Sequence, residues 1–315
     1  AGESSTILLN FTCQHGVPRR GGIYFELPPT FTISSNGTAT ASVTDGNSSM
    51  VSSFTGTSFI LSLGGFHEDL PAGEVINLEI NNVTNPFFEG TTDPFAIKTL
   101  ESDRETPIDE ASATYNSDDR PVGVVIAPGR FEASPLIFLK RTSAGATGAA
   151  SIAFIPSNPV PANGHVVVKF PRNFSSVDCT AAVASGVDGG LLVSVGRDGY
   201  TVDIRRNGTG TDVESGANVS ITLVGGIVNQ QFEGPSDVFP VVKTTLADVD
   251  VSIDEASTEH NSVDRPAVWF TPGTFESPAA VSLEMYVAGA EGGANITFSV
   301  SNPVPHDGHI IVEFP

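Results

Sequence analysis

The chain repeats itself, and this feature constrains its fold more than any other. Two 28-residue segments, 144–171 and 288–315, are identical at 17 positions at an offset of 144, and a diverged third copy occupies 1–28. Tandem copies build arrays that provide length, spacing or multivalency, whereas a catalytic site needs different side chains converging once. The repeat therefore favours an array, and we predict that the chain is not an enzyme.

Shorter matches outside these segments extend the repeat over the whole chain. The pentapeptide IDEAS occurs at 108–112 and 253–257, and Asp-Arg-Pro occurs at 119–121 and 264–266. The period is therefore about 144 residues. We predict three domains: an N-terminally incomplete repeat at 1–103, a complete repeat at 104–247, and the first strands of a third repeat at 248–315.

A partial repeat would expose unpaired strand backbone and apolar side chains. Such an edge is normally covered by another strand. We expect the missing strands to come from one of two sources: the same polypeptide beyond this sequence, or a neighbouring molecule that donates a strand. Donation would propagate head to tail as a linear assembly of copies of the chain.

Periodicity predicts an all-β fold of tandem antiparallel β-sandwiches. Runs rich in Val, Ile, Thr and Phe are bounded by Gly, Pro, Asn and Asp, and no stretch holds a helical period for three turns. The architecture resembles immunoglobulin-like modules, without their Cys-Trp-Cys pattern. In the complete copy we predict strands at 122–126, 136–140, 150–155, 165–170, 180–183, 191–195, 201–205, 219–223 and 238–244.

Two turns carry specific chemistry. Asp198-Gly199 separates two strand-like runs, and Gly tolerates the positive φ that a tight hairpin requires. The repeated SNPVP, at 157–161 and 301–305, reads as a rigid turn before a strand that begins at His165 or His309. We interpret these histidines as strand-start residues packed on the turn, and a ligand or base role is the alternative.

The chain is strongly acidic, with 36 Asp and Glu against 15 Lys and Arg and a net charge of −21. This charge argues against nucleic acid and anionic lipid surfaces as partners. No apolar run approaches the 18 residues of a membrane span, so we predict no membrane insertion. No signal peptide is visible at Ala1, as in a mature secreted fragment.

Cys13 and Cys179 are the two cysteines, and they do not occupy equivalent positions of the repeat. A disulfide within each copy is therefore not predicted. Two readings stay open: a bridge between domains or between molecules, and two small buried thiols.

Eight N-x-[ST] sequons are the most specific local chemistry, against roughly three expected by chance for this composition. Asn and Thr two residues apart on a strand share a face, so an outward Asn can carry a glycan without disturbing the core. We predict N-linked glycans as covalent partners at these acceptors: Asn10, Asn36, Asn47, Asn82, Asn173, Asn207, Asn218 and Asn295.

Acidic residues crowd the junctions between copies, with seven at 101–120 and six at 246–265. Oxygen ligands from a linker and its adjoining domains can hold Ca²⁺, the one cofactor we consider. The candidate ligands are Asp109, Glu110, Asp254 and Glu255. The alternative is a solvated acidic linker without EF-hand spacing, in which each Asp-Arg-Pro forms a local ion pair.

Sequence signatures of catalysis are not present. The chain contains no G-x-S-x-G, H-E-x-x-H, P-loop or G-x-G-x-x-G motif. The adjacent pair Asp109 and Glu110 suits glycoside hydrolysis poorly, because neighbouring residues of an extended chain point to opposite faces.

The repeated run, with its N-P-x-P turn followed by a strand ending in F-P, resembles a module of large surface or secreted proteins of algae, oomycetes and other protists. The resemblance covers the complete copy and both partial copies, although Gln14 to Pro18 replaces SNPVP in the first. It implies extracellular, glycosylated, tandem β-sandwich proteins, and it is compatible with glycosylated protein fibrils of natural waters.

These observations predict a structural repeat unit of a long extracellular or cell-surface glycoprotein, forming a head-to-tail filament or fibre. The alternative is an adhesin-like array that binds carbohydrate or another cell. A sugar site wants exposed aromatic side chains as stacking platforms. With one Trp, four Tyr and Phe residues that look like core, the composition favours the structural interpretation.

Overall fold

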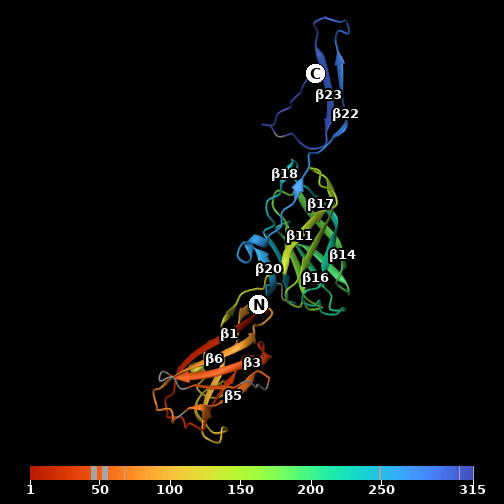
Figure 1. The fold of residues 1–315 in the computed structure, drawn as a ribbon. Coiled ribbons are helices and arrows are strands. Elements are labelled where there is room, and N and C mark those ends of the chain that lie inside the picture. The colour runs from red at the N-terminus through yellow and green to blue at the C-terminus, as the bar shows by residue number, and fades with distance from the viewer. Residues whose placement is uncertain (44–47, 52–55, 67, 248–249, 305, 315) are drawn as a thin grey trace. The chain divides into compact units, whose positions relative to one another are not determined.

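The computed structural model describes residues 1–43, 48–51, 56–66, 68–247, 250–304 and 306–314. These residues form antiparallel β-sheets in two compact units (Figure 1). Unit 1 comprises Ala1–Gly129 with Val251–Asp254, and unit 2 comprises Arg130–Asp250 with Glu255–Pro315. The predicted all-β antiparallel fold class is confirmed.

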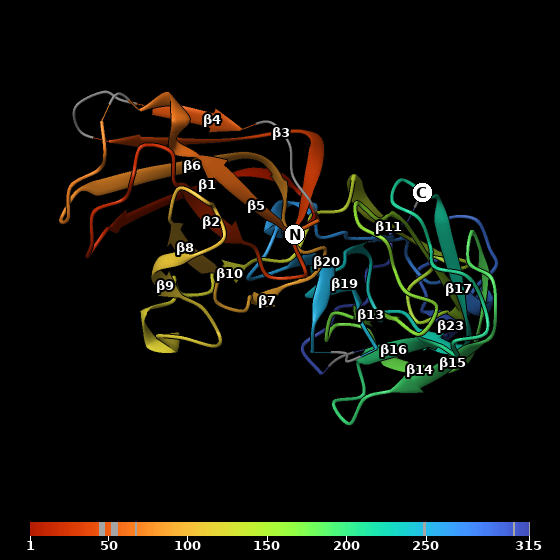
Figure 2. The same cartoon turned by 90° about the horizontal axis from the view of Figure 1, so that it is seen from below.

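Unit 1 has two four-stranded sheets. The first has the order β1 (Ser4–Thr12), β6 (Val75–Thr84), β3 (Thr32–Val43) and β4 (Ser48–Val51). The second has the order β5 (Ser58–Ser62), β2 (Gly22–Glu26), β8 (Ala96–Leu100) and β9 (Pro107–Ala111). A short ribbon pairs β7 (Gly90–Thr91) with β10 (Val125–Ile126), and Figure 2 shows the two layers.

Unit 2 has a related plan, with one sheet of four strands and one of five. One sheet has the order β11 (Ala133–Leu139), β12 (Thr147–Ile155), β17 (Val219–Val228) and β14 (Ser176–Ser185). The other has the order β15 (Leu191–Val195), β16 (Thr201–Arg206), β13 (His165–Lys169), β19 (Val241–Thr245) and β20 (Ser252–Ser257). The ribbon is β18 (Gly234–Pro235) with β21 (Trp269–Phe270).

A further hairpin follows in unit 2, made of β22 (Phe275–Leu283) and β23 (Ala294–Val300). Short 3-10 turns occur at Leu63–Gly65, Ser117–Asp119 and Ser262–Asp264, here called η1, η2 and η3. Strands of the two units occupy matching places: β1, β6 and β3 correspond to β12, β17 and β14. Strand β11 corresponds to β22 of the hairpin, and the described part of unit 1 holds no counterpart of these two strands.

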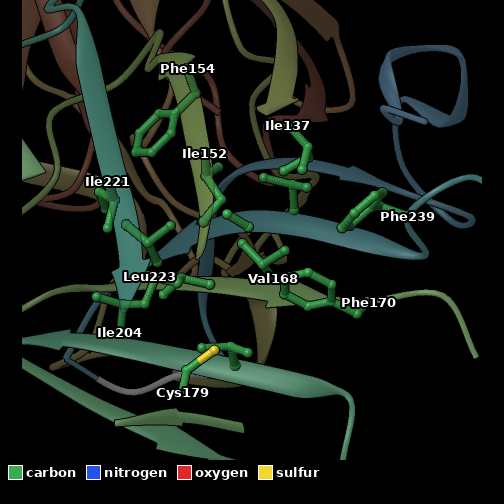
Figure 3. Packing of buried hydrophobic residues seen from close by; sticks show 14 of the residues in the cluster. Ile137, Ile152, Phe154, Val168, Phe170, Cys179, Ile204, Ile221, Leu223 and Phe239 are labelled. Carbon is green, nitrogen blue, oxygen red and sulfur yellow. The ribbon is translucent and has the colours of Figure 1, made fainter. Parts of the chain in front are cut away.

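Side chains from both sheets of each unit meet in one core, which makes each unit a sandwich. In unit 2 the core includes Ile152 and Ile221 from one sheet and Val168 and Ile204 from the other (Figure 3). Aromatic rings close the core at matching places of the repeat. Phe31 contacts Phe95 in unit 1 at 5.7 Å between ring centroids, and Phe174 contacts Phe239 in unit 2 at 5.9 Å.

Every strand predicted for the complete copy has a counterpart, and the main departures lie at its ends. The predicted boundary after residue 103 falls between β8 and β9, which pair in one sheet, so unit 1 continues to Gly129. The two IDEAS segments, predicted within acidic linkers, form the edge strands β9 and β20. The linker interpretation is wrong there, because each segment adds backbone hydrogen bonds to a sheet edge.

The turn predictions are confirmed. Gly199 has a φ of +73°, and the hairpin joins β15 to β16. Asp198 accepts hydrogen bonds from the backbone N–H groups of Tyr200 and Thr201, which hold its pKa well below the usual range. His165 begins β13 as predicted, and its Nδ1 lies 2.7 Å from Asp203 on β16.

The first copy keeps the turn although its sequence departs from SNPVP. Val17 bridges to Leu70 in unit 1 just as Val160 bridges to Val213 in unit 2, and both valines are buried. The two turns therefore share a buried valine followed by a proline, whose ring restricts φ.

The matching aromatic pairs predict a matched loss of stability. Phe31→Ala in unit 1 and Phe174→Ala in unit 2 each remove a fully buried ring, so each should lower the free energy of unfolding of its own unit by about 3 to 5 kcal/mol. Differential scanning calorimetry measures this loss. Leu192→Ala, which truncates an exposed side chain, is the control; an equal effect of the control would contradict the assigned core.

Candidate functional surface

The predicted glycan acceptors differ in their access to solvent. Five of them have exposed side chains and can carry a sugar without disturbing the core: Asn10, Asn36, Asn207, Asn218 and Asn295. Asn82 and Asn173 are half-buried, and Asn47 lies outside the described residues. The structure thus divides the sequons into accessible and obstructed sites.

Local contacts explain the obstruction. The Nδ2 atom of Asn82, where a glycan would attach, donates a hydrogen bond to the Asn36 carbonyl at 3.2 Å. At Asn173, the side-chain Oδ1 is buried next to the core residue Phe174. Asn207, by contrast, forms side-chain hydrogen bonds to the described residues through Oδ1, which accepts from the Thr209 hydroxyl at 2.6 Å and from the Gly190 N–H at 3.1 Å.

The candidate calcium ligands on β9 contact cationic and hydroxyl side chains of the protein. Asp109 lies opposite Thr99 and its carboxylate contacts His15 Nδ1 at 2.7 Å. Glu110 lies opposite Lys98 and contacts its Nζ at 2.9 Å. Neighbouring strand residues point to opposite faces, so these two carboxylates do not converge on one ion.

The corresponding residues on β20 are both buried, Asp254 fully and Glu255 almost fully. Within the part of the chain that the structure describes, no group of three His, Cys, Asp or Glu side chains could hold a metal ion. The four predicted ligands therefore do not form a common calcium site in the described residues, and calcium binding stays a prediction.

Both cysteines are free and lie in the cores of different units. Burial raises the pKa of the Cys13 thiol to about 12 and that of Cys179 to about 11, so neither forms a reactive thiolate at neutral pH. Figure 3 shows the Cys179 sulfur among apolar side chains. The described structure matches the alternative of two small buried thiols, and the bridge between domains or between molecules stays a prediction.

The Asp-Arg-Pro motif does not form the predicted local ion pair. Asp264 of η3 instead binds Arg130, at 2.5 Å from Nε and 2.8 Å from Nη2, and accepts a third hydrogen bond from the Ser134 hydroxyl at 2.9 Å. Arg130 precedes β11 and Ser134 lies on it. The contact therefore fastens β11 to η3. The sequence did not predict it, because the two residues lie far apart in the chain.

The matching aspartate of unit 1, Asp119 of η2, is exposed, and its carboxylate has no ion-pair partner among the described residues. Its environment differs because Arg130 and β11 have no counterpart in the described part of unit 1. The side between β1 and β9 holds a pocket of about 310 Å³. The pocket is lined by apolar and charged side chains that include Phe11, Ile108, Asp109 and Asp119.

The Asp264 contact predicts a pH-dependent stability of unit 2. Hydrogen bonds from Arg130 lower the pKa of Asp264 below its unfolded value of about 3.9. The stabilisation is therefore present above pH 4 and is lost as pH falls through the lowered pKa. Asp264→Asn should lower the Tm of unit 2 by several degrees at pH 7, and the difference from the native protein should shrink toward pH 2.

Thermal unfolding followed between pH 7 and pH 2 measures this effect. Asp119→Asn is the matched control, because its carboxylate has no ion-pair partner in the described residues. A Tm difference for Asp264→Asn that is independent of pH would contradict the assigned ion pair.

Comparison with known proteins gives neither a family nor a function. No family model and no curated protein matches the chain. Among solved structures, the bacterial hydrophobin BslA aligns at 10% identity with a TM-score of 0.26, covering 44% of this chain and 100% of that chain. The N-terminal domain of the Streptococcus gordonii adhesin Sgo0707 aligns at 12% identity with a TM-score of 0.31, covering 81% and 57%.

The C-terminal domain of the Streptococcus pyogenes antigen I/II-family protein AspA aligns at 8% identity with a TM-score of 0.26, covering 87% of this chain and 93% of that chain. At these identities and TM-scores the similarity supports no inference about what this chain does. The described residues also contain no helix with the length and hydropathy to cross a bilayer.

Proposed function

We propose that this chain is a structural segment of a long, extracellular, glycosylated protein whose β-sandwich domains form a linear filament or cell-surface fibre. The observation that carries the proposal is that the same sandwich recurs. Unit 1 and unit 2 share the strand orders β1-β6-β3 with β12-β17-β14 and β5-β2-β8-β9 with β16-β13-β19-β20, and the β22–β23 hairpin repeats β11–β12. Phe275 and Phe298 lie 5.3 Å apart in the hairpin, as Phe131 and Phe154 lie 5.5 Å apart in unit 2.

Within unit 2, the hairpin segment makes a specific contact with the preceding sandwich. Asn302, from the second SNPVP, donates a hydrogen bond from Nδ2 to the Ala144 carbonyl at 3.1 Å. Glycines make room for this side chain, because a Cβ atom on Gly145 would lie 1.6 Å from Asn302 Oδ1 and one on Gly273 would lie 2.5 Å from Nδ2. Asn302 and its glycines all belong to recurring motifs, which supports a defined contact between successive copies.

The surface chemistry fits an extracellular coat. Five exposed sequons and a net charge of −21 favour a hydrated, mutually repelling surface that resists nonspecific association. Glycans at these five positions would leave the core untouched, because the acceptor Asn side chains are exposed to solvent. The proposal assigns the chain a structural role and no catalytic residue.

The alternative is an array that binds carbohydrate through exposed aromatic side chains, of which Trp269 is the single tryptophan. Trp269 on β21 is 64% exposed and could stack on a sugar ring. Its counterpart on β10 of unit 1 is Val125, which offers no aromatic face. A sugar platform built on Trp269 would therefore not recur from copy to copy, and we favour the structural role.

The glycosylation part is tested by secreting residues 1–315 from a eukaryotic cell and mapping glycopeptides by mass spectrometry. We expect sugar at exposed acceptors such as Asn10, Asn207 and Asn218, and unmodified peptides at Asn82 and Asn173. Endoglycosidase should reduce the intact mass accordingly. Unmodified asparagine at all five exposed sequons would contradict the proposal.

The filament part is tested by electron microscopy of the same secreted protein at micromolar concentration. Threads one domain wide are expected. Compact particles alone at every concentration would contradict filament formation, and they would leave the glycosylation result unaffected.

A further inference from the structure

One face of unit 2 is apolar although the chain is strongly acidic. It is the outer face of the sheet β11-β12-β17-β14, which points away from the core. Between 46% and 61% of each of its four large apolar side chains is exposed: Leu136, Phe138, Val183 and Val224. Exposed apolar side chains gathered on one face mark a contact surface.

Strand register places these side chains in rows across the sheet. The first row is Leu136, Ala153, Ser220 and Ser185, and the second is Phe138, Ser151, Thr222 and Val183. The hydroxyl oxygens of Ser151 and Thr222 lie 2.8 Å apart, as expected for neighbours on one face. Neither row contains a charged side chain. These two rows, together with Val224, are here called the apolar face.

A predicted glycan acceptor stands at one end of the apolar face. Asn218 is exposed and immediately precedes β17. Ser220 and Thr222 of β17 lie on the outer face, and alternation along the strand places Asn218 on their side. The chain still lies beside the end of β14 there, because a Cβ atom on Gly186 would lie 2.0 Å from the Asn218 carbonyl oxygen. A glycan on Asn218 therefore starts at the edge of the apolar face.

Strand geometry sets the distance that such a glycan has to cover. The registers place Leu136 two strands away from Asn218, and Val183 one strand away. With a rise of about 3.3 Å per residue and about 4.8 Å between strands, Leu136, Val183 and Phe138 lie about 12 to 16 Å from Asn218. A branched oligosaccharide of several rings spans this distance.

The size of the apolar face argues against a free protein partner. Four strands about 4.8 Å apart, with three rows of side chains about 6.7 Å apart, cover about 400 Å². Two copies meeting face to face would bury about 800 Å², whereas stable protein interfaces bury at least about 1,200 Å². The net charge of −21 on each copy also opposes this pairing. A covalently attached occupant avoids both limits, because its association is intramolecular.

The side chains of the apolar face suit a neutral sugar. Phe138 offers an exposed aromatic ring beside the aliphatic Leu136, and the CH faces of sugar rings pack on such groups. Ser220 and Thr222 carry hydroxyl groups that both donate and accept hydrogen bonds, as sugar hydroxyls do. Rows without charged side chains require no charge on the ligand.

Unit 1 supplies a matched contrast. Its acceptor Asn10 lies on β1 and is exposed on the outer face of the sheet β1-β6-β3-β4. Asn10 lies opposite Asn77 there, and the neighbouring Leu8 lies opposite Glu79. This polar and charged surface gives a sugar little apolar area to cover, so a glycan on Asn10 should extend into solvent.

We propose that the apolar face of unit 2 is the binding surface of the oligosaccharide carried by Asn218 of the same chain. This inference rests on the proposed function, because it requires that Asn218 is glycosylated. The glycan runs from Asn218 over Ser220 toward Leu136 and Phe138, and it shields these side chains from water. It thereby converts a surface that favours association into part of the hydrated coat.

Glycan trimming of the folded chain tests the contact. Residues 1–315 are secreted with high-mannose glycans and treated, without denaturation, with an endoglycosidase that cuts between the first two sugars. Glycopeptide mass spectrometry follows each site. Cleavage requires that the sugar leaves the face, so Asn218 should be trimmed about fivefold more slowly than Asn10. Leu136→Ser with Phe138→Ser, both exposed positions outside the core, should bring the two rates together.

Hydroxyl-radical footprinting reads the protein side of the same contact. Oxidation of Leu136 and Phe138 should rise severalfold when the glycan is removed by Asn218→Gln. The matched control Asn10→Gln removes the glycan of unit 1 and should leave the oxidation of Leu136 and Phe138 unchanged.

Several results would overturn the proposal. They are equal trimming of Asn218 and Asn10 in the native chain, slow trimming that persists in the Leu136→Ser and Phe138→Ser variant, and unchanged oxidation in Asn218→Gln. Slow trimming found only at high protein concentration would assign the face to a second copy instead. Unmodified Asn218 would remove the ligand, while sugar at the other exposed sequons would leave the proposed function standing.

Discussion

An edge strand of a sandwich leaves backbone groups unpaired and lets water reach the core between the sheets. The two units resolve this constraint differently. In unit 2, β11 pairs with β12, buries Ile152 and Phe154, and is fastened to η3 by the Arg130–Asp264 contact. In unit 1, β1 forms the edge, and Ile7, Leu9 and Phe11 remain half-buried above a pocket.

The units otherwise agree in detail although most of their residues differ. The bridge of Val17 to Leu70 repeats that of Val160 to Val213, so the turn survives the replacement of SNPVP. Aromatic rings stay at matching places of the core, where volume and packing constrain them most strongly. The surface changes freely, since the sequons fall at different places in each copy. This division is what a structural array requires, with fixed cores and joints and variable exteriors.

Local chemistry made much of the fold predictable from sequence. Alternation located the strands around Val202 and Ile204, and Asp198-Gly199 specified its hairpin because Gly tolerates the positive φ. The edge strand β9 escaped prediction because its Asp109 and Glu110 read as a solvated linker, and pairing with Thr99 and Lys98 becomes visible only in the sheet. The Arg130–Asp264 contact escaped as well, because it joins residues separated by almost a full repeat.

The central claim is that the chain builds the same sandwich core twice, with aromatic rings at matching places. Hydrogen–deuterium exchange at single-residue resolution tests it most directly, by comparing inner strands of the two units. Strands β6 and β17 are each paired on both sides. The amides of β6 and β17 should both be strongly protected, and Phe31→Ala should speed exchange in β6 while leaving β17 unchanged. Unprotected amides in either strand, or an equal loss of protection in β17 on Phe31→Ala, would contradict the account.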